Sequence, residues 1–333
     1  MNVLLTCVGR RKYLVDYFKS EPLVSLVVGA DMQNSAPGFS GCDICEIVPS
    51  IYDENYIDNI VSICTRNKID LLVSLNDMEL PILSESRELI ESVGTKLAVS
   101  NSEVIDICSD KWLTYQFAQE HNILTPKTYL SPAETIDECA KGLVNYPFII
   151  KPRWGSASFG LFKANNEDEL KRYFSQCKKN LKSSYLNDFA KHEDSVIIQQ
   201  FIQGQEYGVD VFCSLEGDFL SSTQKIKVAM RSGETDKATT VKNAFLSDIA
   251  KLLATKLKHV GNLDCDFFQV DGQFYLLEMN PRFGGGYPFS HEAGSNYVRN
   301  LIESALGMNF SESSYAEGMT FSKCDVLVPS IGN

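Results

Sequence analysis

Two carboxylates and one amide in the last third of the chain could bind a magnesium ion. They belong to the segment Asp266-Phe-Phe-Gln-Val-Asp-Gly-Gln-Phe-Tyr-Leu-Leu-Glu278-Met-Asn280-Pro-Arg282. Side chains alternate along a strand, so Glu278 and Asn280 share one face, whereas Leu277 and Met279 point the other way, into apolar packing. Magnesium prefers carboxylate and amide oxygens. The segment therefore predicts a metal site, although a surface hairpin with its polar side chains in water shows the same alternation.

The register of this hairpin decides whether Asp266 can join the other two ligands. Asp271-Gly272 is a strong turn signal. A strict two-residue turn would pair Cys265 with Glu278 and send Asp266 to the opposite face, whereas a three-residue loop over 271–273 pairs Asp266 with Glu278. We predict the wider loop or a bulge.

A lysine followed by small residues could bind phosphate groups. The segment is Ile149-Ile-Lys151-Pro-Arg-Trp-Gly155-Ser156-Ala-Ser-Phe159-Gly160. A loop of small residues lets backbone N–H groups approach phosphate oxygens closely. The spacing is not that of a G-x-x-x-x-G-K-[ST] loop, so a P-loop enzyme is not indicated. A flexible turn with a surface lysine explains the segment equally well.

Two further segments could serve a nucleotide or its charge. Residues 199–206 run from an apolar strand into Gly204 and Glu206, which would suit a hinge that reads adenine and ribose. Cations at Lys225, Lys227 and Arg231 could neutralise a triphosphate or a substrate carboxylate. A plain strand-turn-strand explains the first segment, and a solvated charged face explains the second.

The histidines carry little signal. His291 follows a run of three glycines and could line a substrate pocket, whereas His121, His192 and His259 are expected at the surface. No arrangement typical of a Ser-His-Asp or Cys-His nucleophile is evident.

Composition excludes several classes of protein. The 333 residues are 44% hydrophobic and 22% charged, which is typical of a globular chain of two or three subdomains. A net charge of -12 disfavours nucleic acid as a partner. No apolar run approaches ~18 residues, and the first residues lack a signal-peptide pattern, so no membrane partner is expected. Ten scattered cysteines, with one C-x-x-C pair at Cys42 and Cys45, favour reduced thiols in the cytoplasm.

The expected elements divide the chain into three parts. Strands and helices alternate over residues 1–105, which predicts an α/β subdomain with a doubly wound parallel sheet. A helix near 110–121, a strand at 148–151 and a strand-helix-strand reaching residue 200 follow. The last part, from about residue 201, favours antiparallel strands and a helix at 245–257. No element is expected for residues 308–333.

The order of these signals resembles the ATP-grasp superfamily, and most closely the group similar to the carbamoyl-phosphate synthetase large subunit. The resemblance covers nearly the whole chain, and its most specific part is E-M-N-P-R at 278–282. It implies an ATP-grasp fold with an N-terminal Rossmann-like pre-ATP-grasp domain at 1–105. The small ATP-grasp subdomain would span 106–200, and the C-terminal subdomain with the magnesium hairpin would span 201–333.

The resemblance also implies roles for individual residues. The residues expected to bind ATP are Lys111, Lys151, Gly155, Ser156, Gly160, Gln200, Phe201, Ile202 and Glu206. The residues expected to bind magnesium, with manganese as an alternative, are Asp266, Glu278 and Asn280. Arg282 and Arg231 would be catalytic, steadying the transferred phosphoryl group. Phe159 and Gln200 depart from the family, since many relatives have lysine and glutamate there.

The implied activity is a carboxylate–amine ligase. A carboxylate would attack the γ-phosphate of ATP, and an amine would then attack the acyl phosphate, releasing ADP and phosphate. Alternatives are a nucleotide-binding regulator without catalysis and a carbamoyl-phosphate synthetase-like subunit that uses bicarbonate. The small-molecule carboxylate and amine are not identified, although Asp31, Asn76-Asp77 and Gly284–His291 are expected near their pocket. A homodimer is compatible with the sequence.

Overall fold

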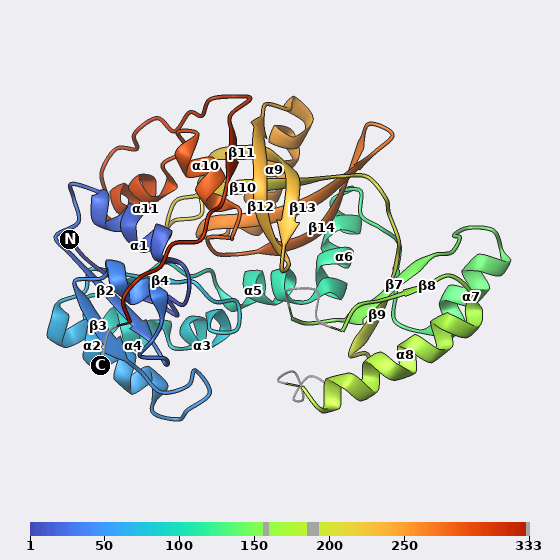
Figure 1. Cartoon of the computed structure of the whole chain (residues 1–333), viewed down its shortest axis with the longest axis horizontal. Coiled ribbons are helices and arrows are strands. Elements are labelled where there is room, and N and C mark those ends of the chain that lie inside the picture. The colour runs from blue at the N-terminus through green and yellow to red at the C-terminus, as the bar shows by residue number, and fades with distance from the viewer. Residues whose placement is uncertain (156–159, 185–192, 331–333) are drawn as a thin grey trace.

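The computed structural model describes residues 1–155, 160–184 and 193–330. Figure 1 shows two bodies: a large one built from the N- and C-terminal parts of the chain, and a smaller lobe, green in the figure, from the middle. Three sheets organise the fold, and each belongs to a different stretch of the sequence.

The first sheet is parallel, as the alternation of strands and helices predicts. Its five strands lie in the order β3-β2-β1-β4-β5. They are β1 (Asn2–Thr6), β2 (Leu26–Asp31), β3 (Ile44–Ile47), β4 (Leu71–Ser74) and β5 (Lys96–Leu97). Leu5 packs in one core with α1 (Lys12–Ser20), whereas Leu4 packs in another with α2 (Tyr56–Asn67). Both faces are therefore covered, as in a doubly wound fold.

Two local expectations for this part need correction. The periodicity of residues 78–93 predicts one helix, whereas the structure has two, α3 (Leu80–Glu85) and α4 (Arg87–Ser92), which meet at Ser86. Strand β3 was not expected, because it has only four residues and carries Cys45 and Glu46 in place of a continuous apolar run.

The second sheet forms the smaller lobe. Its antiparallel strands lie in the order β6-β9-β7-β8. They are β6 (Thr128–Tyr129), β7 (Phe148–Pro152), β8 (Phe162–Ala164) and β9 (Val196–Gln200). Helices α7 (Pro132–Ala140) and α8 (Glu167–Lys182) lie along this lobe (Figure 1). Two helices, α5 (Ser102–Ser109) and α6 (Lys111–Glu120), lead from the first sheet toward it.

The third sheet has six strands in the order β14-β13-β10-β11-β12-β15. They are β10 (Gln205–Cys213), β11 (Phe219–Arg231), β12 (Glu234–Val241), β13 (Gly261–Val270), β14 (Gln273–Asn280) and β15 (Thr320–Ser322). The expected helix is α9 (Ala244–Leu257), which packs against β10 and β11. Two more helices, α10 (Tyr287–Glu292) and α11 (Tyr297–Leu306), share a core with the first sheet. The stretch 308–333, for which no element was expected, contains β15.

The β13–β14 hairpin has the predicted bulge. Val270 pairs with Gln273 across a two-residue turn, so the wider loop is wrong. The register shifts between Asp266 and Phe267, and Asp266 therefore pairs with Glu278. Leu277 is the unpaired residue of the bulge, since its neighbours pair with Phe267 and Asp266.

His259 is buried, so its expected surface position is wrong. Its Nε2 lies 3.1 Å from the Val211 carbonyl oxygen, and its Nδ1 lies 3.7 Å from the Cys213 sulfur. Burial lowers its pKa to about 4. The ring is therefore neutral at pH 7, which is why it can lie within the core. His192 lies outside the described residues.

No helix among the described residues is long and apolar enough to cross a membrane. All ten cysteines are free. Cys42 and Cys45 each lie 3.5 Å from a backbone carbonyl oxygen of the 3-10 turn Pro37–Gly41, and their pKa values are raised, chiefly by burial.

Candidate active site

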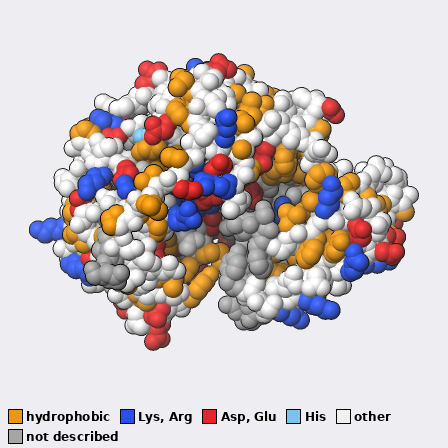
Figure 2. Space-filling model, in the orientation of Figure 1, with side chains coloured by type: hydrophobic (Ala, Val, Ile, Leu, Met, Phe, Trp, Pro, Cys, Tyr) orange, Lys and Arg blue, Asp and Glu red, His pale blue; other side chains and the backbone are white. Residues whose placement is uncertain are grey.

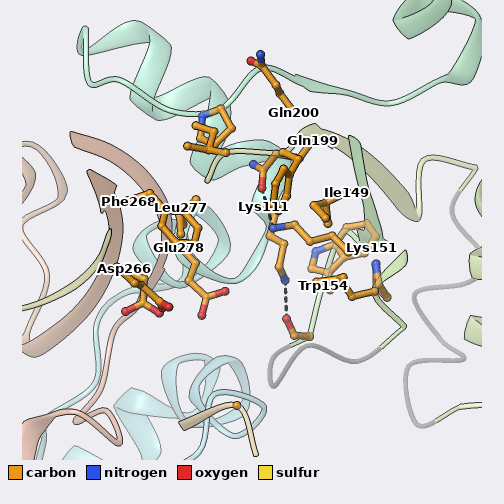
Figure 3. Close-up of a pocket in the computed structure, with 18 of the residues that line it drawn as sticks. Lys111, Ile149, Lys151, Trp154, Gln199, Gln200, Asp266, Phe268, Leu277 and Glu278 are labelled. Carbon is orange, nitrogen blue, oxygen red and sulfur yellow. Dashed lines mark hydrogen bonds between the residues drawn. The ribbon is translucent and has the colours of Figure 1, made fainter. Parts of the chain in front are cut away.

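A cavity of about 540 Å³ lies between the smaller lobe and the third sheet. Strands β7 and β9 supply one wall, and the β13–β14 hairpin supplies the other (Figure 3). Part of its lining is apolar and comes from Ile149, Leu161, Phe201, Ile202, Phe268 and Leu277. Such a lining suits a flat aromatic base. Leu277 was expected to face away, and the bulge explains why it lines the cavity instead.

Two lysines of the expected phosphate site point into this cavity. Lys111 Nζ donates to the Gly155 carbonyl oxygen at 2.5 Å, and Lys151 Nζ donates to Gln199 Oε1 at 2.8 Å (Figure 3). Burial lowers the pKa of both lysines. For Lys151 the nearby charge of Lys111 acts in the same direction, and its pKa falls to about 8. An anion beside Lys111 and Lys151 would favour their protonated forms and so offset the effects of burial and of their mutual repulsion.

Not all of the remaining residues of the expected ATP site line the cavity. Gln200, Phe201, Ile202 and Glu206 line the cavity with Gly155. The backbone N–H of Phe201 already donates to the Pro147 carbonyl at 3.1 Å, so it is not free to bind adenine. Gly160 adopts a positive φ of 65° and is not among the lining residues. Ser156 and Phe159 lie outside the described residues.

A buried lysine connects the expected ribose and magnesium sites. Lys227 Nζ lies 2.8 Å from Glu206 Oε1 and 2.6 Å from Asp266 Oδ1. Burial alone would lower the pKa of Lys227, but the carboxylates of Asp266 and Glu206 outweigh it and raise the pKa. In the sequence, Lys227 is only one of several cations on an expected strand. Its position between Glu206 and Asp266 follows from the pairing of β10 with β11 and β13, which the sequence does not show.

The expected magnesium ligands converge at the end of the hairpin. Asp266 pairs with Glu278 across the strands, and Asn280 follows on the same strand as Glu278. Burial raises the pKa of Asp266 to about 7; Lys227 opposes this rise, and the charges of Asp264 and Glu278 add to it. Among the described residues no three His, Cys, Asp or Glu side chains form a complete metal cluster. Two carboxylates and one amide nevertheless fit magnesium, which usually binds one or two carboxylates together with substrate phosphates.

A second cavity of about 240 Å³ adjoins the first, and Asp266 and Glu278 line both. Arg282 lines it and pairs with Asp77 of the first domain at 2.5 Å between Nη2 and Oδ2. Its Nε is buried and has no hydrogen-bond partner among the described residues. In the middle of the face shown in Figure 2, acidic and basic side chains lie next to one another.

Arg231 is not brought together with the other expected site residues. Its guanidinium lies 2.9 Å from Asp236 and 2.7 Å from Asp325, its side chain is half exposed, and it lines neither cavity. The loop between β11 and β12 contributes Met230 and Gly233 to both cavities instead. The structure therefore gives no support to the expected catalytic role of Arg231.

The segments expected near a substrate pocket are only partly present there. Asn76, Asp77, Gly285 and Gly286 line the second cavity. His291 stacks on Tyr17, with ring centroids 3.6 Å apart, and does not line it. Asp31 Oδ2 accepts a hydrogen bond from Gly9 N and is likewise absent from the lining.

Three charged residues of the second cavity were missed. Arg11, Glu234 and Asp264 all line it. No local pattern in the sequence singles out any of the three, because Arg11 precedes α1, Glu234 begins β12 and Asp264 lies on β13, far apart in the chain. Each becomes visible only when the sheets are assembled.

Comparisons with known proteins agree with this architecture. The family described as the ATP-grasp domain matches residues 108–286, and the PylC-like N-terminal domain matches residues 3–98. The chain is similar to the propionyl-CoA carboxylase alpha chain of Ruegeria pomeroyi, with 26% identity over 240 residues, 67% of this chain and 34% of the relative. It is also similar to the arginine-specific carbamoyl phosphate synthase large chain of Bacillus subtilis, with 24% identity over 248 residues, 71% of this chain and 22% of the relative.

The matches therefore span about a third of the first relative and about a fifth of the second. A solved structure with the same fold is the biotin carboxylase domain of Hydrogenobacter thermophilus 2-oxoglutarate carboxylase, in complex with MgADP, ADP and bicarbonate. Its TM-score is 0.74 at 14% identity, and the match covers 96% of this chain and 73% of that one.

Proposed function

Since the chain belongs to the ATP-grasp family, we propose that it is an ATP- and magnesium-dependent carboxylate–amine ligase that forms a C–N bond and releases ADP and phosphate. The observation that carries the proposal is the pairing of Asp266 with Glu278 where the two cavities meet. One cavity has the size and lining for a nucleotide, and the other has room for a small substrate.

ATP would bind in the larger cavity. Its base would lie against the apolar part of the lining, and Glu206 would accept hydrogen bonds from the ribose. Lys111 and Lys151 would bind the phosphates, where buried cations stabilise developing charge more than they do in water. Asp266, Glu278 and Asn280 would hold magnesium, which supplies positive charge to the phosphoryl oxygens.

Bond formation would take place at the junction of the cavities. A carboxylate oxygen attacks the γ-phosphorus of ATP, and the bond to ADP breaks. The amine nitrogen then attacks the acyl carbon, phosphate leaves, and the proton of the amine passes to solvent. Arg282 would steady the negative charge of the transferred phosphoryl group, because its buried Nε lacks a partner. Asp77 would hold the guanidinium in place.

The proposal is tested by ADP release in the presence of magnesium and pools of carboxylates and amines. Glu278→Gln should abolish release that requires both substrates, because it removes a negative ligand while keeping the shape of the side chain. Asp271→Asn is the matched control, since it makes the same change of acid to amide at the exposed tip of the same hairpin. Asn tolerates the positive φ of 49° at that position.

The other outcomes separate the alternatives. Release with bicarbonate and no amine would favour a carbamoyl-phosphate synthetase-like reaction. Tight binding of ATP without release in any pool would favour a nucleotide-binding regulator. Equal release by Glu278→Gln and Asp271→Asn would overturn the assigned metal site. A homodimer remains part of the proposal, and the mass of the chain in solution tests it.

A further inference from the structure

The second cavity lies where the first sheet is expected to bind ligands. The strand order reverses between β1 and β4. In open α/β sheets, ligands bind outside the carboxyl ends of the strands at such a switch point. Arg11 follows β1, and the segment Leu75–Asp77 follows β4; both line the cavity. The first domain therefore supplies one wall of the substrate site.

Arg11 presents a guanidinium group to this cavity and forms no ion pair among the described residues. Its Nη1 donates to the Phe283 carbonyl oxygen at 3.0 Å and lies 3.5 Å from the Tyr13 hydroxyl. In the part of the chain that the structure describes, no carboxylate lies within ion-pair distance of Arg11. Arg282 lines the same cavity, but its Nε is the donor assigned above to the transferred phosphoryl group. The remaining donors of the Arg11 guanidinium are therefore the ones suited to bind a second carboxylate.

Acidic groups of the same cavity are suited to an ammonium group. Asp77 Oδ1 is buried and has no hydrogen-bond partner among the described residues. Glu234 lies at the exposed rim, where Lys323 pairs with it at 3.2 Å. Burial by itself would raise the pKa of Glu234, but the charges of Lys323, Arg11 and Arg282 lower it, so this carboxylate is ionised.

The balance of charge restricts the occupant further. Three cations line the cavity, namely Arg11, Lys227 and Arg282. Five carboxylates line it as well, namely Asp77, Glu234, Asp264, Asp266 and Glu278. With Asp266 and Glu278 engaged by magnesium, the three remaining carboxylates balance the three cations, so the cavity suits an occupant without net charge better than a highly charged one such as a phosphate ester. A molecule with one carboxylate and one ammonium group meets complementary groups at both ends.

We propose that the amine substrate of the ligase is an amino acid, and that Arg11 binds the carboxylate of this amino acid, which is not the one activated by ATP. The inference rests on the proposed function, because it names the class of one of the two substrates. Arg11 acts as a residue that determines specificity, since it selects amines that carry a carboxylate.

The test compares each amino acid with the amine that lacks its carboxylate. Wild-type protein, ATP, magnesium and a fixed pool of carboxylates are incubated with each compound, and ADP release is measured. The amino acid should support release at least about tenfold better than its decarboxylated amine, since a charge-assisted hydrogen bond contributes roughly that factor or more. Equal use of the two compounds would overturn the proposal while leaving the ligase activity in place.

Adjacent arginines provide a matched pair of variants. Arg11→Gln should raise the KM for the amino acid at least about tenfold and leave the KM for ATP within about twofold. Arg10→Gln should change neither, because the Arg10 side chain is 87% exposed and its one ion pair among the described residues is with Asp325, at 3.8 Å. Arg11→Lys should restore part of the affinity. Identical kinetics for Arg11→Gln and Arg10→Gln would contradict the assignment.

A binding measurement separates this inference from the proposed reaction. The thermal midpoint is recorded with magnesium and a non-hydrolysable ATP analogue, with and without the amino acid. An increase in wild type and Arg10→Gln that is lost in Arg11→Gln supports the site even if no ADP is released. An increase that persists in Arg11→Gln, or one seen only with a phosphorylated compound, overturns it.

Discussion

At the scale of single residues, the two half-buried lysines of the larger cavity determine how nucleotide binding should depend on pH. Lys151 has a pKa of about 8, because burial and the charge of Lys111 both disfavour its protonated form. A phosphate group binds the protonated form. Above pH 8 the free protein therefore has to take up a proton when it binds ATP.

We expect the Kd for a non-hydrolysable ATP analogue to rise as the pH increases through 8, approaching about tenfold per pH unit for the loss of one proton. Calorimetry between pH 7 and pH 9.5 at constant magnesium measures both the Kd and the proton uptake. Lys151→Arg should give a flatter profile, because arginine stays protonated over this range. A wild-type Kd that does not change with pH would show that Lys151 does not bind the phosphates.

The residues that a local pattern alone could group are those close together in the chain, whereas Lys111, Lys151 and Glu206 were joined to them by the family resemblance. Asp266, Glu278 and Asn280 lie on one hairpin, so alternation and register were enough to group them. Asp77 was expected near the substrate pocket, whereas Arg11 enters the site through its bond to the Phe283 carbonyl, 272 positions away. No local pattern records such contacts, because they depend on how the first domain docks on the third sheet.

At the scale of elements, the loop after β14 needs its first glycine. A Cβ atom at position 284 would lie 1.9 Å from Asp264 Oδ2 and 2.8 Å from Asp264 Cβ. A shift of the Asp264 side chain cannot relieve a contact so close to its backbone. The loop that includes Gly285 and Gly286, both of which line the second cavity, would therefore have to move.

Gly284→Ala should lower kcat/KM for the amine substrate about tenfold or more, because small displacements at a substrate site are costly. The Kd for the ATP analogue should stay within about twofold, since residues 284–286 do not line the larger cavity. Steady-state kinetics and calorimetry on the same preparation check both values. An equal loss of nucleotide affinity would mean that the substitution disturbs the whole fold and not this loop alone.

The elements that escaped prediction share a physical cause. The parallel sheet could be expected because its strands are apolar runs that are buried on both faces. Strand β12 carries Glu234, Asp236 and Lys237, and therefore lacks the continuous apolar run or strict alternation that predicts a strand. Strand β15 has three residues and exists through its pairing with β12, about 80 positions earlier in the chain. Neither has the composition that identifies a strand by itself.

At the scale of the whole molecule, one buried histidine limits stability in acid. The pKa of His259 is about 4 in the folded protein and 6.5 as the reference value for the unfolded chain. Its folded pKa is depressed, so the stability is fully present above pH 6.5 and falls as the pH decreases toward 4. The full loss corresponds to about 3 kcal/mol.

Between pH 7 and pH 5, His259 should account for about 2 kcal/mol of the decrease in unfolding free energy. Urea unfolding at the two pH values measures the decrease in the wild type and in His259→Gln. The variant should be less stable at pH 7 but should lose less stability on acidification. His121→Gln, a change at a half-buried histidine, serves as the control. The same decrease in all three proteins would assign acid sensitivity to other groups.

The ion pair between Asp77 and Arg282 also bears on how such proteins can be recombined. It joins the loop after β4 to the segment that follows β14, although the two residues are 205 positions apart. A chimera that takes its first domain from another ATP-grasp protein would keep Arg282, the arginine proposed to act on the phosphoryl group, without its acidic partner, unless the donor has an acid at the same place. The two regions therefore have to be exchanged together. A hybrid protein that receives only one of them should fold but be inactive.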